Sequence, residues 1–204
     1  MQKILALFLI IFIGFQFQDC KVVKKAKSGA DAFDVKQYFL AANLYEKEFE
    51  AVSNPIYKAK LAYGAAVSYQ RMNETLLASQ WFKQAADLDF GDIAWKEYGN
   101  SLIQLGLYDQ AIQVYETLLM KKGSSEEIKL LISSARQSSL LAKESLNFYT
   151  VAPIDLNTPA GEYSPSITPG GELVFTSDRP NTTNTEIYKW TGRSFSDLYV
   201  GQKT

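Results

Sequence analysis

The sequence predicts a mainly α-helical protein, an α-solenoid of paired helices followed by a short β segment. Three observations lead to this prediction. From Ala26 to about Leu146 the chain is rich in Ala, Leu, Lys, Glu and Gln, and only Pro55 interrupts it. Within that stretch, small and aromatic residues recur at an offset of 33. After Phe148 the composition changes, and the remaining residues hold all but one of the six prolines.

The composition is that of a globular protein, with 47% hydrophobic and 21% charged residues. A net charge of −1 provides no basic surface for nucleic acid. The chain has no histidine and one cysteine, which excludes Ser-His-Asp and Cys-His catalysis, metal sites built on His or Cys, and intrachain disulfides. We therefore expect a protein that is not an enzyme, and no residue pattern predicts a small-molecule cofactor.

Residues 1–20, MQKILALFLIIFIGFQFQDC, have the layout of a secretion signal. One lysine precedes an apolar run from Ile4 to Phe15, and polar residues follow it. A run of this length is too short to span a bilayer comfortably, so we expect export. The alternative is a buried N-terminal helix, which the missing polar face disfavours.

The only cysteine, Cys20, lies five residues after the apolar run. Its position resembles that of the lipidated cysteine in a bacterial lipoprotein signal. Asp19 and Phe17 depart from that signal, which has a small residue directly before the cysteine and usually leucine three before it. The resemblance implies an outer-membrane lipid anchor on Cys20. A soluble periplasmic form and an uncleaved anchor are the alternatives.

The repeated pattern predicts pairs of helices. In the third unit, the small residues Gly99 and Ala111 are expected where the two helices cross, and Gly106 is expected to end the first helix with a left-handed backbone. Upstream, Ala41 and Tyr45 occupy the corresponding small and aromatic positions. Three positions of the second unit recur in the third at an offset of 33: Ala78, Phe82 and Ala85 correspond to Ala111, Tyr115 and Leu118.

This pattern resembles the tetratricopeptide repeat, a helix–turn–helix unit of about 34 residues. The second unit departs from it at Asn73, where the turn glycine is usual, and at Thr75, where an aromatic residue is usual. An ordinary helical bundle is the alternative. The resemblance implies a repeat domain over residues 21–148. The third unit carries it best, with these residues in family positions: Trp95, Tyr98, Gly99, Leu102, Gly106, Tyr108, Ala111 and Tyr115.

The last part of the helical region is expected to close the stack. After Gly123, the spacing of Ser124 and Glu127 predicts a capping box and then an amphipathic helix or helix pair. Because the repeat at the end of a solenoid has no further neighbour, its apolar residues can cover the open end.

Stacked repeats of this family form a concave surface lined by first helices, which usually binds a peptide or protein. Lys96 and Asn100 lie one helical turn apart and could together bind a carboxylate. Solvated helix faces are the alternative interpretation. The candidate groove residues are Lys60, Tyr63, Val67, Gln70 and Arg71 in the second unit and Lys96, Asn100, Ile103 and Gln104 in the third.

Residues 149–204 read as β structure with little helical periodicity. The predicted strands are residues 173–176, 186–190 and roughly 194–200, with turns at residues 169–171 and 191–192. Asp178 has no second acid or nucleophile beside it in the sequence that would indicate catalysis.

The motif SPSITPGGELVFTSDRPN with TEIYKWTG resembles one repeat of the TolB-like (WD40-like, PD40) β-propeller. One blade cannot close a propeller, which implies either an incomplete chain or a blade that adds to a partner. We favour an incomplete chain. The motif residues are Pro165, Pro169, Gly170, Phe175, Ser177, Asp178, Arg179, Ile187 and Tyr188.

Together, the signal, the repeats and the blade resemble Bacteroidetes-type outer-membrane lipoproteins of the OmpA family, some of which serve type IX secretion and gliding. The resemblance implies a periplasmic scaffold that binds a protein partner in the cell envelope, with peptidoglycan binding only if an OmpA-like domain follows. Two alternatives are the front part of a propeller-bearing hydrolase such as a peptidase and a nutrient-uptake accessory protein.

Overall fold

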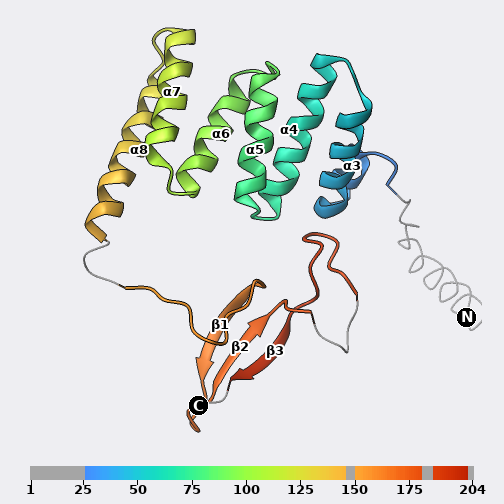
Figure 1. Cartoon of the computed structure of the whole chain (residues 1–204), viewed down its shortest axis with the longest axis vertical. Helices are drawn as coiled ribbons and strands as arrows, with labels where there is room; N and C mark the ends of the chain where they lie inside the picture. The colour runs from blue at the N-terminus through green and yellow to red at the C-terminus, as the bar shows by residue number, and fades with distance from the viewer. Residues whose placement is uncertain (1–25, 146–149, 181–185, 202–204) are drawn as a thin grey trace, which may run out of the picture.

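The computed structural model describes residues 26–145, 150–180 and 186–201, which hold seven helices and three strands. The predicted signal peptide and Cys20 lie outside these ranges. In Figure 1 the helices stand side by side in chain order, and the strands lie beyond one end of them. The elements are α2 (Gly29–Asp34), α3 (Tyr38–Ala51), α4 (Pro55–Arg71), α5 (Thr75–Asp87), α6 (Asp92–Gln104), α7 (Tyr108–Lys122), α8 (Glu126–Ser145), β1 (Glu162–Ile167), β2 (Leu173–Ser177) and β3 (Asp197–Gly201).

The helical part is an α-solenoid, as predicted. Each helix packs against its neighbours in the sequence, from α2 on α3 through to α7 on α8. The pairs are α2 with α3, α4 with α5, and α6 with α7, and α8 packs on α7. Among the described helices, none combines the length and the apolar character needed to cross a membrane.

The turn inside each helix pair has the same geometry. Lys36, Asn73 and Gly106 have φ values of 58°, 59° and 74°, so each occupies the left-handed region. The next residue of each turn donates its N–H to a carbonyl five residues earlier, for example Leu107 to Leu102 at 2.8 Å, which is a Schellman closure. Gly106 ends its helix as predicted, and Asn73 replaces glycine because asparagine tolerates this backbone.

The repeated small and aromatic positions hold the pairs together. In all three pairs the aromatic residue of the second helix packs near a small residue of the first. A Cβ on Gly99 would overlap the Tyr115 ring, and a Cβ on Gly29 would overlap the Tyr45 ring. The small residues that recur in the second helices are also fully or almost fully buried: Ala41, Ala78 and Ala111. The predicted spacing is therefore a packing requirement, since a larger residue would push the helices apart.

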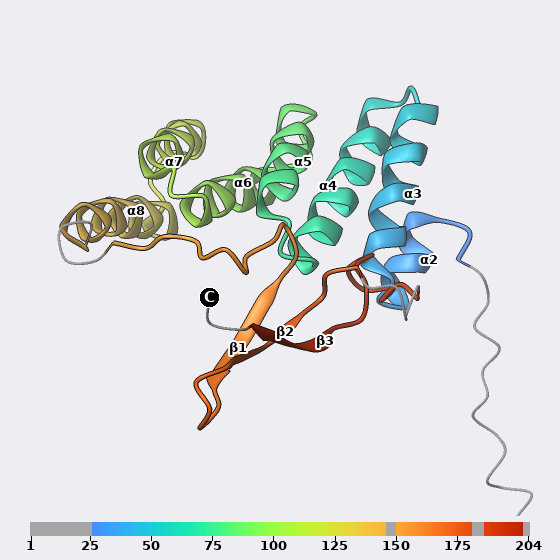
Figure 2. The same ribbon diagram turned by 60° about the horizontal axis from the view of Figure 1, so that its bottom comes forward.

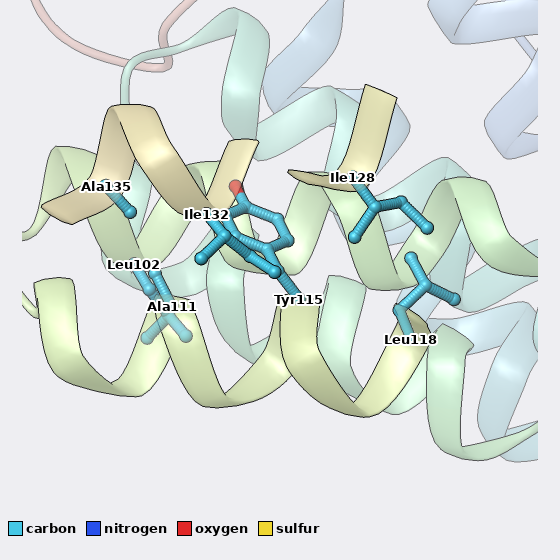
Figure 3. Packing of buried hydrophobic residues seen from close by; sticks show 7 residues of the cluster. All are labelled: Leu102, Ala111, Tyr115, Leu118, Ile128, Ile132 and Ala135. Carbon is cyan, nitrogen blue, oxygen red and sulfur yellow. The ribbon is translucent and has the colours of Figure 1, made fainter. Parts of the chain in front are cut away.

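Helix α8 covers the end of the stack. Figure 3 shows Tyr115 and Leu118 of α7 facing Ile128 and Ile132 of α8. The predicted cap is displaced by one residue, because α8 begins at Glu126 and the Ile128 N–H donates to Ser125 Oγ at 3.5 Å. Ser125 therefore has the capping role that the sequence pattern gave to Ser124.

The three strands form one antiparallel sheet in the order β1–β2–β3. The predicted strands at residues 173–176 and 194–200 correspond to β2 and β3. The strand predicted at residues 186–190 is wrong, since only an isolated bridge between Ile187 and Ser194 forms there before a tight turn. Strand β1 was missed because it contains Pro165 and the left-handed Ser164, both unusual inside a strand.

One face of the sheet is covered and the other is open. On the covered face Phe175 is buried and lies parallel to Tyr199, with the Arg179 guanidinium over both rings. On the open face the register places Val174 beside Val200, and Val200 is 58% exposed. Residues 150–155, which lead into the sheet, are exposed.

Candidate functional site

The first helices of neighbouring pairs are bridged by polar side chains. Gln70 of α4 donates its Nε2 to Glu97 Oε2 of α6 at 3.2 Å. Lys96 of α6 forms an ion pair with Glu127 of α8, at 2.8 Å between Nζ and Oε1. Figure 2 shows α6 and α8 on one side of the array and α7 on the other. The helices that the sequence assigns to the groove, α4 and α6, therefore form one face, which α8 extends.

In α4, the candidate residues differ in how far they are accessible. Lys60 is exposed. Tyr63 stacks on Phe90 with ring centroids 4.2 Å apart and meets Phe82 edge-on at 5.6 Å, so its ring fills space between helices. Val67 is partly buried against the Phe82 cluster. Of these three, Lys60 is the one that presents a charge to solvent.

The end of α4 has a second role that the sequence pattern did not indicate. The Arg71 side chain is exposed, while its backbone carbonyl accepts a hydrogen bond from the indole N–H of Trp190 at 3.0 Å. Gln70 is tied to Glu97 as described above. The part of this face at the C-terminal end of α4 is therefore next to the β segment.

In α6, the predicted pair Lys96 and Asn100 lies on the same side but is already engaged. Lys96 holds the Glu127 carboxylate, and Asn100 Oδ1 accepts a hydrogen bond from the buried Tyr115 hydroxyl at 2.8 Å. That bond uses the amide oxygen, which leaves the Asn100 nitrogen as a donor. Ile103 is partly buried, and Gln104 accepts from Thr75 Oγ1 at 3.4 Å.

Two carboxylates that organise this region were not among the candidates. Glu127 binds Lys96 from α8. Glu46 Oε1 accepts from the Tyr69 hydroxyl at 2.6 Å and from Trp81 Nε1 at 3.1 Å, which joins α3, α4 and α5. No sequence motif marks Glu46, although its place directly after the aromatic position of the first unit puts it near the helix contact.

Burial raises the pKa of several tyrosines of the array. Desolvation raises the pKa of Tyr115 to about 12, with a smaller contribution from the negative charge of Glu97. Desolvation also raises the pKa of Tyr69, and the hydrogen bond to Glu46 adds to it. In both cases the neutral phenol is favoured in the folded protein.

We expect the array to lose stability in alkaline solution. A phenol whose folded pKa lies above its unfolded value of about 10 contributes fully below pH 10, and that contribution is lost as pH rises through the folded pKa. Replacing Tyr115 by Phe removes this titration, so its unfolding midpoint should fall less between about pH 10 and pH 12. Urea unfolding of wild type and Tyr115→Phe at several pH values checks this. Exposed Tyr57→Phe is the control, and equal pH slopes in wild type and Tyr115→Phe would contradict the assignment.

The acidic groups of the β segment have structural partners. Hydrogen bonds from Thr158, then from Ser177 and Arg179, lower the pKa of Glu162. Asp178 Oδ1 accepts the Gly161 N–H at 2.7 Å, and its second oxygen lies 3.8 Å from Arg193. These bonds tie the loops around the sheet.

The described part of the chain contains no group of three or more Cys, Asp or Glu side chains placed to hold a metal ion. Hollows of the described residues lie at the sheet, around Phe195 and beside α8, and the nine predicted groove residues do not line them. The candidate face is thus an open helical surface rather than an enclosed pocket.

No family model matches the chain, and no curated protein matches it. Among solved structures, it is similar to the second TPR domain of human RPAP3 in complex with HSP70 peptide SGPTIEEVD, at 24% identity and a TM-score of 0.45, covering 53% of this chain and 88% of that one. It is also similar to the Sgt2 TPR domain from Aspergillus fumigatus, at 23% identity and a TM-score of 0.43, covering 65% and 85%.

The repeated packing positions and turns define the class of this protein. Residues 29–145 form a tetratricopeptide-type α-solenoid, and a small three-stranded antiparallel sheet follows it. The resemblance of the sheet to a propeller blade remains a prediction.

Proposed function

We propose that this protein is a non-enzymatic scaffold of the cell envelope that binds an acidic peptide segment of a protein partner across α4, α6 and α8. The observation that carries the proposal is the shared face of these helices. Lys60, Lys96 and the Asn100 amide all belong to it, on helices whose spacing is fixed by buried contacts. A rigid face with cationic and amide donors is suited to carboxylates, because the donors need no rearrangement to bind.

The Lys96 environment supports an acidic ligand. Its ammonium group already binds one carboxylate, Glu127, whose side chain is 65% exposed. The Lys96 side chain is 24% exposed, so the pair is only partly in solvent, but its exposed carboxylate is held by a single contact that a carboxylate of a partner can replace. Lys60, in the neighbouring unit, provides a second cation for a ligand that runs along the face.

The proposed location rests on the sequence of residues 1–20 and on the resemblance to OmpA-family outer-membrane lipoproteins. Cys20 is proposed to carry the lipid anchor, and a role in type IX secretion or envelope organisation fits that resemblance. Labelling cells with a fatty-acid analogue tests the anchor in wild type and Cys20→Ala. Label on the wild type alone supports it, and label on neither protein rejects it.

The binding proposal predicts which lysines matter. Peptides selected from a random library for binding to the full chain should be acidic. The double variant Lys60→Ala/Lys96→Ala should bind them about tenfold more weakly, since each charged contact contributes about 1 kcal/mol or less at an exposed site. Isothermal titration measures the affinity.

The matched control is Lys47→Ala/Lys83→Ala, which removes two exposed lysines from the second helices α3 and α5. It lowers the net charge equally and should leave the affinity unchanged. Equal weakening in both double variants would indicate attraction by overall charge and would reject the α4–α6 face as the binding site.

A further inference from the structure

A turn of the β segment reaches back to the helical array. Residues 188–193, here called the tryptophan turn, are closed by hydrogen bonds from the Thr191 and Gly192 N–H groups to the Tyr188 carbonyl, at 3.1 and 2.8 Å. Figures 1 and 2 both show this loop beside the end of α3. The described strands do not pack extensively on any helix, so this turn carries the attachment.

Trp190 completes a hydrophobic cluster that otherwise belongs to the array. Its ring meets Tyr38 edge-on, with centroids 4.7 Å apart. The other members of the cluster come from α2, α3, α4 and the residue that follows α4: Phe33, Tyr38, Ala42, Tyr69 and Met72. A side chain from the far end of the sequence thus occupies an aromatic site of the first two helix pairs.

The polar contacts of Trp190 use backbone groups that helix ends leave unpaired. Phe39, in the first turn of α3, donates its N–H to the Trp190 carbonyl at 3.2 Å. Arg71, the last residue of α4, accepts the indole N–H at 3.0 Å. The turn therefore satisfies one donor and one acceptor that neither helix can satisfy internally.

The next residues of the turn also have matched partners. Gly192 has a φ of 73° and lies so close to the Phe39 ring that a Cβ would overlap it. Arg193 forms an ion pair with Glu74 at 2.7 Å, with the two side chains 40% and 36% exposed. These contacts with the array therefore require a tryptophan, a glycine two residues after it and an arginine directly after the glycine.

The aromatic site at the start of α3 is not repeated in the next helix pair. One unit further along, Thr75 takes the position of Tyr38 at the start of the second helix. Thr75 has no aromatic ring to pack against a tryptophan, and its hydroxyl donates to Gln104. The following Leu76 is 59% exposed. The sequence change at this repeat position thus leaves the start of α5 without the aromatic ring that Tyr38 provides at the start of α3, while Tyr108 stands at the equivalent position of α7.

We propose that the ends of α3 and α4 are a docking site for a tryptophan-bearing turn, and that residues 188–193 are a detachable latch that fixes the sheet against the array. When closed, the latch sets the orientation of the open sheet face relative to the helical face. When open, the exposed residues 150–155 allow the sheet to move. This proposal does not depend on the identity of any partner.

Distance measurements test the latch in the full chain. Spin labels are attached to Gln113→Cys of α7 and Ile167→Cys of β1, in a Cys20→Ser background. Pulsed electron paramagnetic resonance then measures the distance between the two labels. In wild type we expect one narrow distribution of label-to-label distances. In Trp190→Ala, the fraction of molecules with distances outside that distribution should be about tenfold larger. Glu74→Gln should give about a two- to threefold increase, because the pair it breaks is partly exposed.

Lys189→Ala is the matched control, since this exposed neighbour of Trp190 forms no hydrogen bond or ion pair with the described residues of the array. An unchanged distribution in Trp190→Ala, or equal broadening in Lys189→Ala, overturns the proposal. Far-ultraviolet circular dichroism monitors helix content, and Glu74→Gln keeps the test decisive if Trp190→Ala loses helix.

Binding in trans tests the docking site separately. A cyclised peptide of residues 186–195 should bind the Trp190→Ala chain at least about tenfold more tightly than wild type, whose site is occupied by its own turn. The same peptide with Trp190→Ala should bind neither chain. Equal binding of the tryptophan peptide to both chains, or a wild-type dimer that Trp190→Ala dissociates, overturns the assignment to a latch within one chain.

Discussion

Replacing Phe82 by alanine is expected to lower the free energy of unfolding of the array by about 3–5 kcal/mol. Phe82 is fully buried and packs with Ala66 and Ala78, and Tyr63 meets its ring edge-on. It comes from the middle unit, so the cavity would lie between helices that have neighbours on both sides. Such helices cannot close the cavity without moving the next pair, and this places the loss at the upper part of the range.

Chemical denaturation followed by helical circular dichroism measures this loss. Leu76→Ala in the same helix is the control, because Leu76 is 59% exposed and its truncation should cost less than about 1 kcal/mol. Similar losses for the two variants would contradict the central role of Phe82. A transition that splits into two steps would instead indicate that the pairs on either side of α5 unfold separately.

The repeat packing could be predicted from sequence because its rules are local. Ala78 and Ala111 recur at a fixed spacing, and a small residue facing an aromatic residue has one simple packing explanation. The left-handed turn at Gly106 follows from the lack of a Cβ. Lys36 occupies the equivalent turn position without any such signal, since a lysine there is determined by the surrounding helices rather than by its own preference.

The β segment could not be predicted from local rules in the same way. Strand β1 forms in spite of Pro165 because it is an edge strand, where a missing N–H costs little. Residues 186–190 are rich in β-branched and aromatic residues, as strands are, yet Trp190 is held by the array instead. The Trp190 and Arg71 partners are 119 residues apart, so no local pattern could connect them.

The candidate groove could be predicted only in part. The positions on α4 and α6 follow from the repeat spacing, but their availability depends on partners from other helices. Glu127 of α8 binds Lys96, and Tyr115 of α7 binds Asn100. Those contacts depend on how α8 closes the stack, which hydrophobic spacing alone does not specify.

Replacing Gly99 by valine is expected to destabilise the array by about 3 kcal/mol, at the upper end of what overpacking costs. An added Cβ would overlap the Tyr115 ring, and the branched side chain adds two further methyl groups. Tyr115 cannot move aside easily, since it is 1% exposed and its hydroxyl is bonded to Asn100. Glycine usually destabilises a helix interior by about 1 kcal/mol, so a gain in helix propensity offsets only part of the clash.

A double-variant cycle separates the clash from other effects of valine. Tyr115→Ala alone should cost about 3–5 kcal/mol, but Gly99→Val combined with Tyr115→Ala should cost clearly less than the sum of the two single changes. The reason is that the smaller side chain leaves room for the valine. Ser133→Val, at an exposed position of α8, is the control for β-branching and should change stability by less than about 0.5 kcal/mol. Additive costs in the cycle would mean that Gly99 is required by backbone geometry and not by the Tyr115 ring, which would remove the packing explanation for the small position of the repeat.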